Sequence, residues 1–136
     1  MSALTEFLFP APAPREPMAI LRWWERRRVP YNVAVGAAGM FSLTVVSVVQ
    51  ALPPFSSPVV PPLGGILVFG ILANVCYCLG PLTELAAGAI WGRTVLPTGP
   101  TLYRMGLTFS VGLALLPTLI VMIMWVVASV ATVLTA

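Results

Sequence analysis

Three long stretches that are almost free of charge constrain the fold of this 136-residue chain more than any other feature. Residues 31–52 and 105–135 contain no charged side chain, and residues 63–91 contain a single one, Glu84. A helix needs about 20 consecutive apolar residues to cross a hydrocarbon core of roughly 30 Å. The sequence therefore predicts an all-α integral membrane protein with three transmembrane helices, at 31–52, 63–91 and 105–135.

The composition excludes a water-soluble globular domain. The chain is 59% hydrophobic and 8% charged, whereas soluble domains are roughly 45–50% apolar and about 25% charged. Its charged residues are seven arginines and four glutamates, with no histidine, lysine or aspartate. With so few groups that can activate a nucleophile or transfer a proton, we expect no enzyme, no metal site and no intrinsic cofactor.

The segment before the first span is predicted to have two parts. Residues 1–17 alternate proline with small and apolar residues, which favours an extended tail, retained in the cytoplasm. Residues 18–29 contain neither glycine nor proline, and Pro17 suits the first position of a helix. We expect these residues to form a short amphipathic interfacial helix that ends at Pro30, followed by a three-helix transmembrane domain over 30–136.

Arginines and paired tryptophans crowd the predicted interfacial helix. Tryptophan favours the headgroup level of a membrane, and neighbouring arginines can bind anionic lipid phosphates. The residues predicted to contact lipid headgroups are Arg22, Trp23, Trp24, Arg26, Arg27 and Arg28. Three consecutive arginines more often determine topology than bind a ligand, so the topology role is the favoured interpretation of Arg26–Arg28. Lipid explains this cluster more simply than nucleic acid, so we expect no nucleic-acid partner.

The placement of the arginines predicts an orientation. Five of the seven precede the first span, two lie between spans two and three, and the 53–62 loop has none. Cytoplasmic loops carry the excess of positive charge. The N-terminus is therefore expected in the cytoplasm and the C-terminus in the periplasm, with the chain in a bacterial inner membrane.

Each predicted span has one side with small or polar residues, which lipid cannot satisfy and which let another backbone approach closely. These sides are expected to pack against protein. Their residues are Asn32, Gly36, Gly39, Ser47 and Gln50 in the first span, Asn74, Tyr77 and Glu84 in the second, and Gly106 and Ser110 in the third.

The polar residues of the second span leave two interpretations open. Asn74, Tyr77 and Cys78 can form hydrogen bonds between helices or contact a ligand or pigment. Glu84 can be a near-interfacial carboxylate that pairs with Arg93, Arg104 or one of Arg26–Arg28. It can also act as a proton relay or a counter-ion.

Two segments resemble those of a set of small bacterial multi-pass membrane proteins. The first reads WWERRRVPYN over residues 23–32, and the second reads ANVCYCLGPLTE over residues 73–84. The resemblance implies the multi-pass topology and no particular activity. It also marks Asn32, Asn74, Tyr77 and Glu84 as one connected polar set.

The expected function is that of a non-catalytic accessory subunit packed within a larger photosynthetic or respiratory membrane complex. Its partners would be other integral membrane subunits and anionic lipids. Contacts with quinone, carotenoid, chlorophyll or lipid would then be to molecules that neighbouring subunits hold. The alternative is a small oligomeric transporter or ion-handling protein that uses Glu84.

Overall fold

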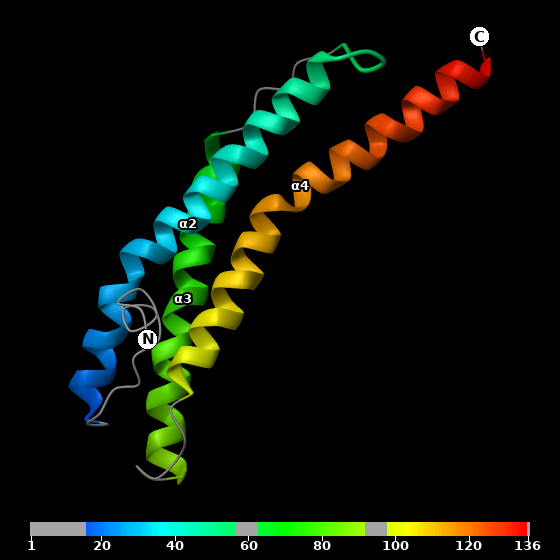
Figure 1. Ribbon diagram of the computed structural model, residues 1–136. Coiled ribbons are helices and arrows are strands. Elements are labelled where there is room, and N and C mark those ends of the chain that lie inside the picture. Colours follow the sequence, from blue (N-terminus) through cyan, green and yellow to red (C-terminus); the bar gives the residue numbers. More distant parts are fainter. Residues whose placement is uncertain (1–15, 57–62, 92–97, 136) are drawn as a thin grey trace, which may run out of the picture. The chain divides into compact units, whose positions relative to one another are not determined.

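Three long α-helices make up almost all of the described chain (Figure 1). The computed structural model describes residues 16–56, 63–91 and 98–135. The helices are α2 (Pro17–Ala51), α3 (Leu63–Trp91) and α4 (Gly99–Thr135), and each is long and apolar enough to cross a membrane. This confirms an all-helical chain with three candidate spans. The predicted tail, residues 1–17, lies outside the described residues apart from its last two positions.

Proline and carbonyl caps fix where two of the helices begin. The Glu16 carbonyl accepts hydrogen bonds from the backbone N–H groups of Ala19 (2.9 Å) and Ile20 (3.1 Å), so Pro17 is the first helical residue, as predicted. The Thr98 carbonyl accepts one from Leu102 at 2.9 Å. Helix α4 therefore starts at Gly99 rather than at residue 105. Pro100 is tolerated in its first turn, because the N–H that proline lacks would find no partner within the helix there.

The helix break predicted at Pro30 does not occur, since α2 continues through that residue. Residues 18–29 are the first turns of α2 and not a separate helix. An internal proline removes one backbone hydrogen bond, and packing of the neighbouring turns can compensate for this loss. Trp24 and Tyr31, on either side of Pro30, are both bonded to α3. That residues 18–29 lie at a membrane interface stays a prediction.

The chain divides into two compact units, and every helix contributes to both. Unit 1 comprises Met1–Asn32 and Ile71–Thr108, and unit 2 comprises Val33–Gly70 and Phe109–Ala136. The described core of unit 1 is aromatic and contains charged groups, whereas that of unit 2 is built from small aliphatic residues and serines.

Hydrogen bonds connect parts of unit 2 that are distant in the sequence. Thr118 Oγ1 donates to Ser42 Oγ at 2.8 Å, where Ser42 is 2% exposed. The Trp125 indole donates to the backbone carbonyl of Pro53 at 2.9 Å. Hydroxyl contacts of this kind join helices within membranes, where a polar group has no water to bind.

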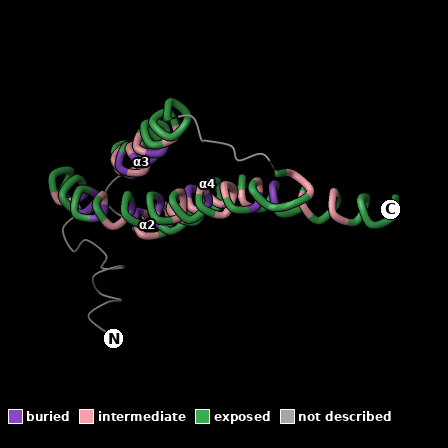
Figure 2. Tube along the Cα trace, turned by 90° about the horizontal axis from the view of Figure 1, so that it is seen from above, coloured by how far each residue is buried: buried purple, intermediate pink, exposed green. Residues whose placement is uncertain are grey.

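Large apolar side chains are exposed along all three helices. Leu63 and Leu134 are 78% and 80% exposed, and exposed residues recur along every helix in Figure 2. A soluble protein rarely exposes apolar surface so extensively. The exposed surface and the three long apolar helices indicate a multi-pass membrane protein.

Candidate functional site

The polar and aromatic residues of unit 1 gather in one buried group, which we call the aromatic cluster. Helix α2 contributes four of its members, α3 two and α4 one. Each has at most 8% of its surface exposed. The members are Trp23, Trp24, Arg27 and Tyr31 of α2, Tyr77 and Glu84 of α3, and Tyr103 of α4.

Trp24 is the centre of the cluster and is bonded to α3 at two places. Its indole Nε1 donates to Glu84 Oε2 at 2.8 Å, and its backbone carbonyl accepts a hydrogen bond from the Tyr77 hydroxyl at 2.5 Å. Both bonds are buried. A buried carboxylate or hydroxyl needs such partners. Without them, the free-energy cost of removing the group from water exceeds what a typical hydrogen bond adds to stability.

The backbone of α3 leaves room for the Trp24 ring only because residue 80 is glycine. A Cβ atom at Gly80 would lie within 2.9 Å of three indole atoms, Cη2, Cζ3 and Cζ2. Real Cβ contacts are essentially never that short. The close approach therefore depends on the missing side chain.

The Glu84 carboxylate lies against the start of α4. A Cβ atom built at Gly99, the first residue of α4, would be 2.5 Å from Glu84 Oε2. Helix α4 has no acidic residue in its own first turn. A carboxylate is favoured at a helix N-terminus because the helix dipole is positive there. Glu84 thus supplies the negative charge from α3.

Aromatic rings fill the space between the three helical segments of unit 1. The centroid of Trp24 lies 5.4 Å from that of Tyr77 and 6.2 Å from that of Tyr103, both edge to face. Trp23 contacts Trp24 at 5.3 Å and Tyr103 at 6.3 Å, also edge to face. Tyr31 lies 4.6 Å from Tyr77, and its hydroxyl donates to the Ala73 carbonyl at 3.1 Å. Aromatic pairs of this geometry contribute about 0.5–1.5 kcal/mol each beyond their buried area.

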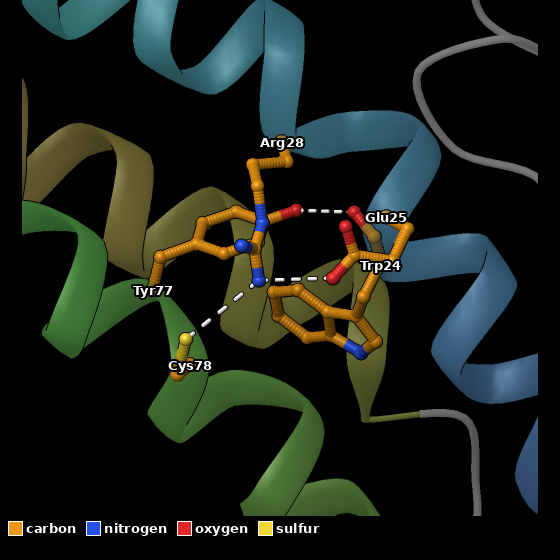
Figure 3. A network of polar contacts seen from close by, with 5 residues as sticks. All are labelled: Trp24, Glu25, Arg28, Tyr77 and Cys78. Carbon is orange, nitrogen blue, oxygen red and sulfur yellow. Dashed lines mark hydrogen bonds and ion pairs between the residues drawn. The ribbon is translucent and has the colours of Figure 1, made fainter.

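Arg27, a member of the cluster, and its neighbour Arg28 make different contacts. The Arg27 guanidinium lies 3.8 Å from the Trp23 ring centroid, and its Nη1 donates to the Trp23 carbonyl at 3.3 Å. Arg28 is half-buried and faces three groups, as Figure 3 shows. It pairs with Glu25 at 2.9 Å, approaches the Cys78 sulfur at 3.7 Å and lies 5.6 Å from the Tyr77 ring centroid.

The predicted packing residues fall into three groups. Tyr77 and Glu84 belong to the cluster and are connected through Trp24, whereas Asn32, Gly36 and Gly106 are exposed. A Cβ atom at Gly36, Gly39 or Gly106 would meet no heavy atom within 4 Å. The remaining predicted residues are buried or half-buried, namely Gly39, Ser47, Gln50, Asn74 and Ser110. Which of these positions contact another protein stays a prediction.

The residues predicted to contact lipid headgroups are also divided. Trp23, Trp24 and Arg27 are buried at 8%, 2% and 5% exposure, so their side chains pack against protein. Arg22 and Arg26 are exposed, and Arg28 is half-buried. The described structure thus leaves the two exposed arginines as the most accessible of the six.

Four residues of the site lie outside the predicted set. They are Tyr31 and Tyr103, which belong to the cluster, and Gly80 and Gly99, which lie against it. One general signal was available, because a tyrosine in an apolar helix usually finds a partner for its hydroxyl. The two glycines gave no comparable signal, since glycine is common in membrane helices.

The cluster is chemically suited to hold helices together. In it, an indole N–H donates a hydrogen bond to a carboxylate, and two tyrosine hydroxyls donate hydrogen bonds to backbone carbonyls. Within the described ranges, no three metal-ligating side chains come close enough to hold a metal ion. No protein-family model matches the chain, and no curated protein or solved structure is significantly similar to it.

Proposed function

We propose that the chain is a non-catalytic subunit that packs within a larger membrane complex, with its N-terminus in the cytoplasm. Asn32 carries the proposal. Asn32 is an exposed residue of α2, near the start of the charge-free stretch 31–52. Lipid cannot form the hydrogen bonds of an amide, so an exposed asparagine at membrane depth is best satisfied by another protein.

Two further features support a packing role. Gly36, one turn after Asn32, is exposed and has open space around it. Small residues of this kind let a second helix approach closely. In the cluster, Glu84, Tyr77 and Tyr31 form hydrogen bonds between helices. The larger complex that we propose is a photosynthetic or respiratory one.

Site-specific photocrosslinking in the native membrane tests the proposal. A benzophenone amino acid at position 32 or 36 is expected to crosslink α2 to another membrane protein, which mass spectrometry would identify. Phe41 is a matched control, because it is aromatic, 58% exposed and on a different side of the helix. We expect lipid adducts from position 41. Lipid adducts alone from all three positions would exclude the packing role at this face.

A small oligomeric transporter or ion-handling protein is the second candidate, and the buried Glu84 carboxylate favours it. An ionisable group within a membrane segment is a reasonable site for a proton or cation. Proton flux into liposomes that contain the purified chain would support this function if Glu84→Gln abolished it. Flux that is absent from the wild type, or unchanged in the variant, would exclude it.

A further inference from the structure

We propose that Arg22 and Arg26, on the exposed side of the first turns of α2, bind the phosphate of an anionic membrane lipid. This inference goes beyond the packing role. It requires only that α2 enters the membrane, so it can fail or succeed independently of any protein partner.

The first turns of α2 have two distinct faces. Met18, Arg22, Arg26 and Val29 fall within about 80° of one another by helical spacing, and all four are exposed. The opposite face carries the residues of α2 that belong to the aromatic cluster, and these are buried. The arginine pair therefore projects from a part of the helix whose other side is fixed by packing.

Among the described residues, no carboxylate forms an ion pair with Arg22 or Arg26. Glu25 lies between the two arginines in the sequence, but it pairs with Arg28 at 2.9 Å. Glu84 accepts the Trp24 indole N–H. Like charges one turn apart repel each other on a helix. An anion that contacts both guanidinium groups would remove this repulsion.

Arginine suits a phosphate better than other cationic side chains do. Its planar guanidinium donates paired hydrogen bonds to two phosphate oxygens. Side chains at i and i+4 start about 5–6 Å apart, and long arginine side chains can converge on one group from that spacing. Arg27 is excluded from this role, because its guanidinium lies over Trp23 and is 5% exposed.

Exposed apolar residues beside the pair distinguish a lipid from a soluble anion. Met18 is 62% exposed and Val29 is 69% exposed, one on each side of the arginines along the same face. Val29 also lies next to the long charge-free stretch that begins at residue 31. An acyl chain that runs from the bound phosphate toward this charge-free stretch would cover Val29, which an inorganic phosphate or a nucleic acid would leave exposed.

Lipid binding to the full chain in neutral detergent micelles tests the proposal. Native mass spectrometry would measure the apparent Kd for phosphatidylglycerol, with phosphatidylcholine and inorganic phosphate as separate arms. We expect Arg22→Gln and Arg26→Gln each to weaken phosphatidylglycerol binding about tenfold, as loss of a hydrogen bond to a charged group does. The double variant should lose little more, because both residues hold one phosphate.

Arg104→Gln is the matched control, since it also removes one exposed arginine from unit 1. We expect it to leave the affinity for phosphatidylglycerol nearly unchanged. Equal losses in all three single variants would mean that only net charge attracts the lipid, and the pair would not be a site. Inorganic phosphate that binds as tightly as phosphatidylglycerol would show a site for a free anion and overturn the lipid assignment. Circular dichroism of each variant checks that the helices remain folded.

Discussion

The indole of Trp24 donates a 2.8 Å hydrogen bond to the Glu84 carboxylate and so joins α2 to α3 across 60 positions of the sequence. Both side chains are buried, at 2% and 8% exposure. The same carboxylate lies against Gly99 at the start of α4. One polar contact thus involves all three helical segments of unit 1, which makes it a sensitive place to test the structure.

Removing the indole donor is expected to destabilise the protein. Trp24→Phe keeps an aromatic ring but leaves the Glu84 carboxylate without this partner, so the free energy of unfolding should fall by about 1–3 kcal/mol. Unfolding of the protein in detergent by a denaturing surfactant would measure the change. Trp125→Phe is the control, because its indole donates to an exposed carbonyl of Pro53, and we expect a smaller loss. A double-mutant cycle with Glu84→Met should give a coupling of about 0.5–3 kcal/mol, and additive effects would contradict the bond.

Replacing a glycine of α3 by alanine should lower stability at Gly80, which is packed, but not at Gly88, which has open space around it. Gly80→Ala forces the Trp24 ring to move, so we expect a loss of about 1–3 kcal/mol of stability, typical of overpacking. Gly88→Ala in the same helix meets no heavy atom within 4 Å. It should be neutral or stabilise the helix by up to about 1 kcal/mol, because alanine favours helix over glycine. The two variants can be compared by thermal unfolding in the same detergent, and equal stability would argue against the Trp24–Gly80 packing.

Replacing Arg27 should lower the stability of the protein much more than replacing the adjacent Arg26. Arg27→Ala removes a guanidinium that lies 3.8 Å from the Trp23 ring centroid and a buried hydrogen bond, so stability should fall by roughly 1–2 kcal/mol. Arg26 is exposed, and Arg26→Ala should change stability by less than about 0.5 kcal/mol in lipid-free detergent. Differential scanning fluorimetry would measure the unfolding temperatures of both variants. The buried role assigned to Arg27 would be wrong if both variants unfolded at the wild-type temperature.

The proposed orientation predicts which ends of the helices reach the periplasm. An alkaline phosphatase domain fused after residue 136 should be active, because that enzyme folds only where its disulfides can form. A fusion within residues 92–97 should be inactive, since the neighbouring arginines favour the cytoplasm. Green fluorescent protein fused at the same positions should give the reciprocal pattern. An active fusion within 92–97 would reverse the proposed topology.

Helix positions could be predicted from the sequence more accurately than helix boundaries. The second apolar stretch, 63–91, has the same limits as α3. Helix α4 starts before the predicted residue 105, and α2 passes through Pro30 where a break was expected. Both differences concern proline, whose cost depends on what surrounds it. A cap at Thr98 and the packing around Trp24 and Tyr31 reduce that cost in ways that local sequence does not reveal.

The candidate site was predictable in part. Tyr77 and Glu84 stand out as polar residues in an apolar segment, whatever they contact. The structure describes a hydrogen bond from Trp24 to Glu84, and the arginine partner that the sequence suggests for Glu84 stays a prediction. Tryptophans at the end of a span are usually read as interfacial anchors, and that pattern hides the packing of Trp23 and Trp24 within the protein.

The sequence by itself determined that this chain forms three long apolar helices, because a backbone in lipid must satisfy its hydrogen bonds within each segment. The tertiary structure decided which side chains meet. Trp24 and Glu84 are 60 positions apart, and Tyr31 and Ala73 are 42 apart. Contacts at such separations depend on how each helix is rotated about its axis and on the space left by residues such as Gly80. These follow from side-chain packing, which helical periodicity alone does not fix.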